Sequence, residues 1–186
     1  MLGQIAVFLI ETVAGFFVLL LLARFHFQWL GVPFQNPAGQ FVLAMTSWLV
    51  MPVRSVLKGV GRRGWDVPTL LLAWAVQALS IVARLAIFGS EPALLPVLAV
   101  SLLDLARYSI YLLMFAVLVL AVMSWFQSYS PLTPALDAFT RPFLRPFRRL
   151  IPPVGGFDLT PLVLLVLLQV LLIVLEYARP FAARIG

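Results

Sequence analysis

Four stretches of the sequence are long and apolar enough to cross a lipid bilayer, and this feature limits the possible folds more than any other. A membrane-spanning helix needs about 20 mostly apolar residues. The sequence provides them near residues 5–24, 67–88, 108–126 and 159–177. Only 11% of the residues are charged and 63% are hydrophobic, whereas a soluble domain of this length would need more charge on its surface. The sequence therefore predicts an all-α integral membrane protein with four transmembrane helices.

The third apolar stretch is too long for one simple span, because it runs from residue 93 to residue 126. Asp104 and Arg107 lie one helical turn apart within it. We therefore expect an interfacial helix over residues 93–107, with these two charges paired at the membrane surface. The span itself would then begin at residue 108.

Two connections between the expected spans carry most of the basic residues. One covers residues 31–66 and contains Arg54, Lys58, Arg62 and Arg63. The other covers residues 128–158 and contains Arg141, Arg145, Arg148 and Arg149. Because cytoplasmic loops of membrane proteins are enriched in lysine and arginine, we expect both connections in the cytoplasm and both termini outside.

The two halves of the chain, residues 1–90 and 91–186, are similar in sequence. Pairs that align at an offset of 94, or of 92 after a slip of two residues, include Pro37/Pro131, Thr46/Thr140, Pro52/Pro146, Arg54/Arg148, Asp66/Asp158 and Gln77/Gln169. Each half would contain one span, one basic connection and a second span. Because two spans return the chain to its starting side, the halves are expected to be parallel repeats related by an axis along the membrane normal.

The residues shared by the halves also carry a family resemblance. The first half has the pattern N-P…P-x-R…G-W-D between residues 36 and 66, and the second has S-P…R-P-F-R-R-L-I-P-P-x-G-G-F-D between residues 130 and 158. Over nearly its whole length the chain resembles the bacterial YggT family, which has relatives in plastid membranes. The resemblance implies a small multi-pass protein of the bacterial inner membrane, with tandem repeats and no established biochemical activity. Roles proposed for the family are osmotic-stress tolerance or ion uptake, cell division or shape, and, in plastids, haem attachment or nucleoid organisation.

The second basic connection contains Pro142 and Pro146, which lack a backbone N–H and restrict the residue before them to an extended backbone. We expect a short helix over residues 133–139, followed by a kinked segment, re-entrant or amphipathic, along the membrane. Its apolar side chains, Leu144 among them, would enter the acyl boundary while the arginines face the phosphate headgroups. The first connection would do the same more weakly.

Three roles are open for the basic connections. Their charges could serve only to set the topology, or they could bind a specific lipid or a partner protein. The candidate binding residues are Arg54, Lys58, Arg141, Arg145, Arg148 and Arg149. Nucleic acid is not expected as a partner, because the aromatic residues here are phenylalanines at a lipid boundary and no base-stacking module is recognisable.

Asp66 and Asp158 each precede a span and follow a glycine and an aromatic residue. A carboxylate in this position can cap the N-terminus of the helix, where the helix dipole favours a negative charge. Each can also form a salt bridge, Asp66 with Arg54 and Asp158 with Arg148, which would hold each basic connection to its own span. The two roles are compatible.

Two further aligned pairs of polar residues fall inside the spans. Gln77 and Gln169 lie 11 residues beyond the aspartates, close to three helical turns. Because a buried amide in lipid needs a partner, the two glutamines are expected to hydrogen-bond across the repeat interface or to line a polar path. Arg84 and Glu176 align with opposite charges, and we expect a salt bridge between them.

Glu11 and His26 each have two interpretations. Glu11 lies in the first apolar stretch, so it is either a functional intramembrane carboxylate or a residue near the outer interface. His26 follows the first span, where it is either an interfacial residue or an axial ligand of haem. The sequence has no other histidine and no cysteine to complete a metal site.

The sequence contains no phosphate-binding loop, nucleophile elbow or zinc-protease motif. It therefore predicts a protein that is not an enzyme and holds no cofactor. The favoured function is a membrane scaffold, assembly or stress-homeostasis factor that binds anionic lipid or a membrane-protein partner, including a second copy. The alternative is an oligomeric transporter or small channel for osmotic or ion balance. A third possibility is a maturation factor or enzyme acting on a membrane-embedded substrate.

Overall fold

The structure is a computed structural model that describes residues 1–57, 65–125, 130–150 and 158–184. Over these residues the chain is all-helical and contains no strand. The helices are α1 (Leu2–Trp29), α2 (Pro37–Val56), α3 (Val67–Ile87), α4 (Leu94–Trp125), α5 (Thr133–Leu150) and α6 (Thr160–Ala182). The prediction of an all-α chain is therefore confirmed.

Four of these helices, α1, α3, α4 and α6, are long and apolar enough to cross a membrane. In α4 the candidate span covers Leu94–Ser124, and in the other three it covers the whole helix. The number of predicted spans is thus confirmed, and the fold is that of a multi-pass membrane protein. The two remaining helices, α2 and α5, lie in the two basic connections.

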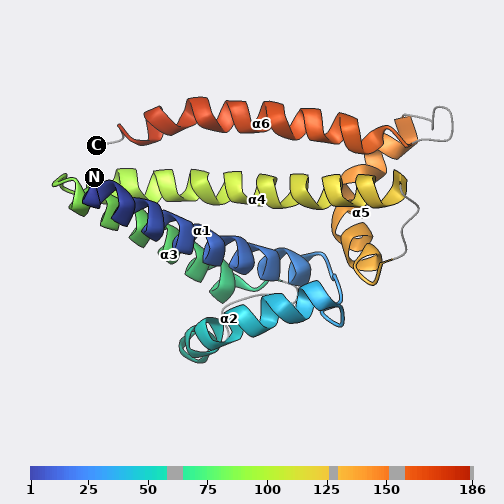
Figure 1. Cartoon of the computed structure of the whole chain (residues 1–186), viewed down its shortest axis with the longest axis horizontal. Helices are drawn as coiled ribbons and strands as arrows, with labels where there is room; N and C mark the ends of the chain where they lie inside the picture. The colour runs from blue at the N-terminus through green and yellow to red at the C-terminus, as the bar shows by residue number, and fades with distance from the viewer. Residues whose placement is uncertain (58–64, 126–129, 151–157, 185–186) are drawn as a thin grey trace.

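The six helices form two groups of three, one from each half of the chain (Figure 1). In the first group α1 packs against α3 and α2 contacts both, while in the second α4 packs against α6 and α5 contacts both. Helix α4 joins the groups through its contacts with α1 and α3. The order of elements is the same in each half, although the repeat in the sequence stays a prediction.

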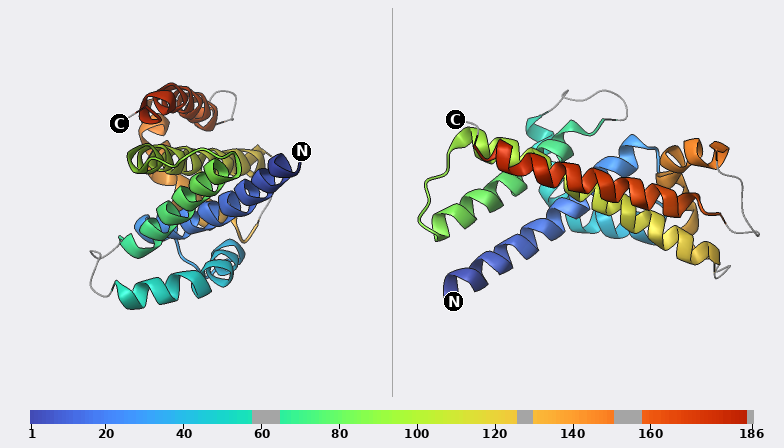
Figure 2. Two further views of the ribbon diagram at one scale, coloured as in Figure 1. Left: turned by 90° about the vertical axis from the view of Figure 1, so that its left-hand side faces the viewer. Right: turned by 90° about the horizontal axis from the view of Figure 1, so that it is seen from above.

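Both termini and the α3–α4 connection lie at one end of the bundle, and α5 crosses the other end (Figures 1 and 2). We call these the termini end and the α5 end. Helices α1 and α4 run away from the termini end, and α3 and α6 return to it. Helix α2 leaves the far end of α1 and runs beneath α1 and α3 in the view of Figure 1.

Helix α4 is one continuous element, where the sequence predicted an interfacial helix over 93–107 and a separate span from residue 108. After Pro96 in its first turn, α4 contains no proline or glycine that would interrupt it. Asp104 is buried in the protein. A single long helix with an internal carboxylate therefore replaces the two expected elements.

Helix α5 is also continuous, although Pro142 and Pro146 were expected to end the helix after residue 139. Both prolines are exposed, on the side of the helix where water or headgroups can reach the carbonyl groups that lose a hydrogen bond. On the opposite side Leu144 is fully buried. The apolar burial of this side therefore keeps the segment helical across both prolines.

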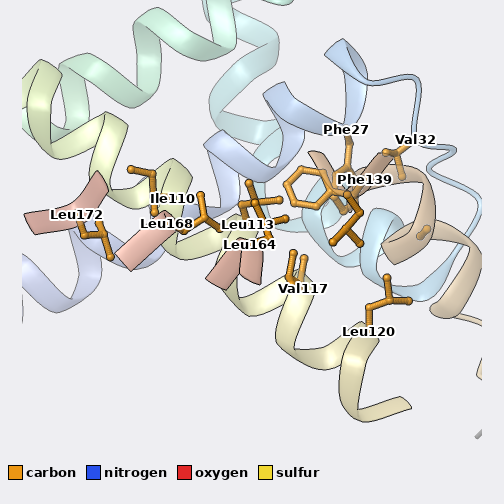
Figure 3. Close-up of a cluster of buried hydrophobic side chains, with 13 residues drawn as sticks. Phe27, Val32, Ile110, Leu113, Val117, Leu120, Phe139, Leu164, Leu168 and Leu172 are labelled. Atoms are coloured by element: carbon orange, nitrogen blue, oxygen red, sulfur yellow. The ribbon is translucent and has the colours of Figure 1, made fainter. Parts of the chain in front are cut away.

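The largest apolar cluster joins α1, α4, α5 and α6 (Figure 3). In it Phe27 of α1 meets Phe139 of α5, with ring centroids 5.8 Å apart. Helix α6 contributes a row of leucines at helical spacing, namely Leu164, Leu168 and Leu172. A second cluster joins α1, α2, α3 and α4 and consists of Val18, Leu21, Leu22, Val50, Ala73 and Leu105. These two clusters fix α5 and α2 against the long helices.

Candidate functional site

Helix α5 carries its arginines on the side opposite its buried face. Phe139 and Leu144 are buried in the largest apolar cluster, and α5 contacts both α4 and α6. Leu144, which was expected to enter the acyl boundary, is thus inside the protein. The exposed arginines are Arg141, Arg145, Arg148 and Arg149, and we call this surface the basic face of α5. The predicted binding arginines of the second half are therefore displayed by a helix that is held in place.

Two arginines of the basic face are engaged by carboxylates. Arg141 pairs with Asp137 one turn earlier at 2.8 Å. Arg148 pairs with Asp158 at 3.2 Å, so that the end of α5 is tied to the start of α6. The other two arginines of the basic face form no ion pair with any residue that the structure describes. Their guanidinium groups are available to an external anion.

Asp158 has both of the roles that were considered for it. Besides the salt bridge to Arg148, its Oδ1 accepts a hydrogen bond from the backbone N–H of Thr160 at 2.9 Å and another from the Thr160 hydroxyl. Burial alone would raise the pKa of Asp158, but the hydrogen bonds from Thr160 and the charge of Arg148 outweigh it and hold the pKa below its ordinary value. Asp158 therefore stays ionised at neutral pH and anchors the basic face.

The first half has a corresponding contact between Arg54 of α2 and Asp66, whose carboxylate is almost fully buried. Asp66 also accepts a hydrogen bond from the Thr69 hydroxyl, but within the described residues its side chain accepts none from a backbone N–H. Arg54 donates in addition to Gln28 at the end of α1, at 3.2 Å. The salt bridge is present, whereas capping by the side chain is not. Lys58, the other candidate of this connection, lies outside the described residues.

One buried charge close to α2 was not among the predicted site residues. Arg24 of α1 donates hydrogen bonds to the hydroxyls of Thr46 at 2.9 Å and Ser47 at 3.3 Å. No ion pair to Arg24 occurs among the residues that the structure describes. The signal in the sequence would have been the pair of hydroxyl residues in the otherwise apolar middle of α2. Arg24 therefore joins α1 to α2 through neutral acceptors.

His26 belongs to α1, and its ring contacts Phe139 of α5. Its Nδ1 is 2.7 Å from the carbonyl oxygen of Leu22, and its ring lies edge-on to Phe139 with centroids 6.2 Å apart. The part of the chain that the structure describes contains no group of three His, Cys, Asp or Glu residues able to hold a metal ion. The contacts of His26 are those of a residue that packs at a helix interface.

A second set of polar side chains lines a cavity of about 240 Å³, to which all four long helices contribute. The lining residues are Glu11 of α1, Gln77, Ser80, Ile81 and Arg84 of α3, Asp104, Arg107, Tyr108 and Tyr111 of α4, and Arg179 of α6. We call this cavity the polar chamber. It lies toward the termini end, because Arg84 and Arg179 belong to the last turns of their helices. The predicted residues Glu11, Gln77 and Arg84 thus meet, together with α4 and α6 residues that were not predicted as part of a site.

Asp104 is the centre of the hydrogen bonding in the polar chamber. Its Oδ2 accepts from Nε2 of Gln77 at 3.0 Å and from Nη2 of Arg179 at 3.2 Å. Nη1 of Arg107 lies 3.7 Å from Oδ1. The predicted pairing of Asp104 with Arg107 is present, but it is inside the protein and involves two further partners. One carboxylate therefore connects α3, α4 and α6.

Arg84 pairs with Glu11 and not with Glu176, so the expected salt bridge is wrong in its partner. Nη1 of Arg84 lies 3.3 Å from Oε1 of Glu11, and both side chains are partly exposed. Glu176 is exposed on α6 and forms no ion pair with a described residue. The reason is that α1 packs along α3, which brings Glu11 within reach of Arg84.

The two glutamines aligned by the repeat have different surroundings. Gln77 is buried against Asp104, whereas Gln169 is exposed on the surface of α6. The expected contact between the glutamines is therefore absent, because one side chain is inside the protein and the other is on its outer surface. Leu162, Val166 and Ile173, at heptad spacing with Gln169, are exposed as well. Gln169 is a polar residue on an otherwise apolar helix surface.

The polar chamber ends against apolar side chains on the side of the α5 end. The inward-facing residues that follow there on the four long helices include Val18, Ala73, Leu113 and Leu172. They belong to the two apolar clusters, one of which is shown in Figure 3. Among the residues that the structure describes, packed apolar side chains thus border the chamber on the side of the α5 end.

Comparisons with known proteins give a consistent result. The model of the CCB3/YggT family matches residues 3–87 and 99–178, one segment in each half of the chain. "Uncharacterized protein YggT" of Escherichia coli strain K12 is 37% identical over 166 residues, which cover 88% of this chain and 85% of that protein. An uncharacterised protein of Haemophilus influenzae is 32% identical over 90% of this chain and 88% of its own length. Another, PA0392 of Pseudomonas aeruginosa, is 28% identical over 87% of this chain and 83% of its own length. No solved structure matches the chain.

Proposed function

The chain belongs to the CCB3/YggT family, as its motifs predicted, and we propose that it is a non-enzymatic membrane scaffold that binds anionic lipid headgroups through the basic face of α5. The relatives that match are named as uncharacterised proteins, so the proposal depends on geometry. The observation that carries it is that Arg145 and Arg149 are exposed on a helix packed against the bundle. Neither arginine forms an ion pair with a carboxylate of the described residues.

The energetics favour headgroup binding at this position. A basic residue near an anionic membrane surface contributes about 1 kcal/mol. The basic face of α5 has two arginines, Arg145 and Arg149, without a carboxylate partner among the described residues. Because α5 is fixed by buried Phe139 and Leu144, little conformational freedom is lost when a headgroup binds. The salt bridge between Arg148 and Asp158 holds the end of the helix in register. The first half contributes less, because Arg54 is engaged by Asp66.

The lipid proposal is tested by reconstitution in nanodiscs that contain phosphatidylglycerol and phosphatidylcholine. The protein is released from the nanodiscs together with its bound lipid, and native mass spectrometry measures how far phosphatidylglycerol is enriched in that lipid. We expect the variant Arg145→Gln/Arg149→Gln to lower the enrichment about fivefold per residue, since 1 kcal/mol corresponds to that factor. Arg184→Gln, which removes an exposed arginine at the termini end, is the matched control. Equal enrichment by the wild type and the double variant would overturn the proposal and leave the arginines as topology signals or as a site for a protein partner.

We propose that the scaffold lies in the bacterial inner membrane, with α2 and α5 toward the cytoplasm and the termini outside. This orientation is supported by the positive-inside rule, because Arg141, Arg145, Arg148 and Arg149 are in α5. The chain has no cysteine, so single cysteines can be introduced as reporters. We expect a membrane-impermeant maleimide to label Ser90→Cys in whole spheroplasts but Ser55→Cys only after lysis. The reverse pattern would invert the orientation.

We also propose that the scaffold associates with a second copy of itself through the surface of α6 around Gln169. An amide can both donate and accept, so two copies of Gln169 can satisfy each other across a twofold axis, where lipid offers no partner. Leu162, Val166 and Ile173 would pack beside it. Fluorescence energy transfer between labelled copies in liposomes should fall in Gln169→Leu and stay unchanged in Val170→Leu, which keeps an apolar surface. Unchanged transfer in both variants would exclude this interface.

The polar chamber favours a second candidate function, that of an oligomeric transporter or small channel. It contains the carboxylate of Glu11 and the amide of Gln77, which lie in helices apolar enough to cross a membrane. Packed apolar side chains border the chamber on the side of the α5 end, which argues against conduction by one copy. A path would therefore have to form between copies. Ion flux into proteoliposomes, measured for the wild type, Glu11→Gln and Gln77→Leu, decides the question. Flux that the variants abolish would favour transport over the scaffold.

A further inference from the structure

We propose that the polar chamber is a binding site for a phosphate group, in the form of a phospholipid headgroup or of free phosphate. This site is separate from the basic face of α5, because it lies toward the opposite end of the bundle and is built from other helices. The proposal therefore does not depend on the proposed function. It rests on the charges, the unused hydrogen-bond donors and the shape of the chamber.

The charges that line the chamber favour an anion. Three guanidinium groups, those of Arg84, Arg107 and Arg179, face two carboxylates, those of Glu11 and Asp104. The lining therefore has one positive charge in excess. A cationic ligand would meet three arginines, and a metal ion would find no set of three acidic or imidazole ligands among the described residues. An anion would instead complete the charge balance of a partly buried site.

Within the part of the chain that the structure describes, the arginines of the chamber retain most of their donor capacity. A guanidinium group has five N–H donors. Arg179 uses one of them on Asp104, and Arg84 uses one on Glu11. Arg107 donates to the hydroxyl of Tyr111 at 3.4 Å and approaches Asp104 only to 3.7 Å. The remaining donors suit a phosphate group, whose oxygens accept several charge-assisted hydrogen bonds at once.

The chamber is also pre-formed for such a ligand. Asp104 holds Arg107 and Arg179 from two different helices, and Gln77 fixes the carboxylate from a third. A volume of about 240 Å³ is equivalent to roughly eight water molecules at about 30 Å³ each. That is enough for a phosphate group with some of its water. Arg84 and Glu11, the partly exposed pair, are the members that can move to admit it.

A neighbouring groove favours the lipid as the source of the phosphate. This groove, of about 570 Å³, runs between the ends of α3 and α6 and the start of α4. It shares Ile81, Arg84 and Arg179 with the chamber, and Val97 and Val100 of α4 form part of its apolar wall. Glu91 and Glu176 also line the groove. A phosphate on the shared arginines would leave an acyl chain beside this wall. Free phosphate would use the chamber alone.

The test uses the full chain purified in an uncharged detergent, with three probes. These are a short-chain phosphatidylglycerol, a diacylglycerol with the same chains and no phosphate, and inorganic phosphate. Thermal unfolding and native mass spectrometry report binding. In the Arg145→Gln/Arg149→Gln variant, which weakens binding at the basic face of α5, we expect one retained copy of phosphatidylglycerol and a raised unfolding temperature, while the diacylglycerol gives neither. If inorganic phosphate alone has the same effect, the chamber is a site for free phosphate. If the diacylglycerol binds as well as phosphatidylglycerol, the phosphate site is excluded.

Two variants assign the binding to the chamber. Arg84→Gln/Arg107→Gln should weaken phosphatidylglycerol binding roughly tenfold or more for each charged hydrogen-bond donor removed. Arg84→Gln alone keeps the Asp104 contacts intact and should fold as the wild type does, so it decides the question if the double variant is unstable. Arg145→Gln/Arg149→Gln is the control, because it weakens only the basic face of α5. Retention of full binding by Arg84→Gln would overturn the proposal.

Discussion

Gln77 on α3 donates a hydrogen bond to Asp104 on α4 at 3.0 Å, and both side chains are buried. The contact joins the last long helix of the first half to the first long helix of the second. Both residues lie in helices that are otherwise apolar enough to cross a membrane. A buried amide and a buried carboxylate are tolerated there because they satisfy each other and because Arg107 and Arg179 approach the same carboxylate. This group of side chains is therefore a structural link as well as the wall of the polar chamber.

We predict that Asp104→Asn destabilises the protein by about 2 kcal/mol or more, because it leaves Arg107 and Arg179 without their carboxylate in a partly buried site. The unfolding midpoint in detergent is the measurement. Gln77→Leu is the comparison variant, and it should cost less, since it removes one neutral donor and leaves both ion pairs in place. If Asp104→Asn unfolds at the temperature of the wild type, Asp104 is not the hub of this group.

The sequence predicted the helical spans because they depend on composition and length alone. Each of the four apolar stretches became part of a long helix, and the salt bridges of Arg54 with Asp66 and Arg148 with Asp158 followed from short separations along the chain. Such contacts are local, so pattern and spacing are sufficient to find them.

The contacts between distant residues were not predictable in the same way. The alignment of the halves suggested Arg84 with Glu176, but the choice of partner depended on the packing of α1 along α3, which brings Glu11 to Arg84. The breaks expected in α4 and α5 are absent for a related reason, because both helices are stabilised by contacts with distant parts of the chain. In α4 the carboxylate of Asp104 is satisfied inside the protein by Gln77, Arg107 and Arg179. In α5 the burial of Leu144 stabilises the helix across prolines that would end an isolated helix.

We predict that Thr46→Val destabilises the protein more than Thr140→Val. Both hydroxyls are fully buried and both donate to the carbonyl oxygen four residues earlier. Only the hydroxyl of Thr46 also accepts from Arg24, at 2.9 Å. The difference between the variants therefore isolates the loss of an acceptor for a buried guanidinium group, about 1.5 kcal/mol or more. Equal unfolding midpoints for the two variants would show that Arg24 finds another acceptor at no cost.

The salt bridge at the end of α5 should make stability depend on pH in the acid range. The pKa of Asp158 is held below its ordinary value of 3.8, so its ionised form stabilises the folded state above that pH. This contribution is lost as the pH falls through the lowered pKa of the folded protein. The difference in unfolding midpoint between the wild type and Asp158→Asn should therefore be constant from neutral pH to about pH 5 and should shrink below pH 4. A difference that persists unchanged at pH 3 would assign the effect to hydrogen bonding alone.

The start of α2 requires a glycine, and Gly39→Ala tests how rigidly α2 is placed. A Cβ atom on Gly39 would lie 2.7 Å from the Cα and the carbonyl oxygen of Phe34, which are backbone atoms and cannot rotate away. The cap formed by Asn36, whose Oδ1 accepts from the N–H of Gly39 at 2.9 Å, would have to shift with them. We expect a loss of about 1–3 kcal/mol from the strain. Gly3→Ala is the matched control, because its Cβ would meet only a side-chain methyl group, Cγ2 of Ile87, at 3.3 Å.

Both substitutions place alanine in a helix, where it is favoured over glycine by about 1 kcal/mol, so this gain cancels in the comparison. A lower unfolding midpoint for Gly39→Ala, with Gly3→Ala equal to or above the wild type, would mean that the turn at Phe34 fixes α2 against α1. A tolerated Gly39→Ala would mean that α2 can slide along the bundle. In that case the salt bridge of Arg54 with Asp66, and not the turn, would determine where the helix lies.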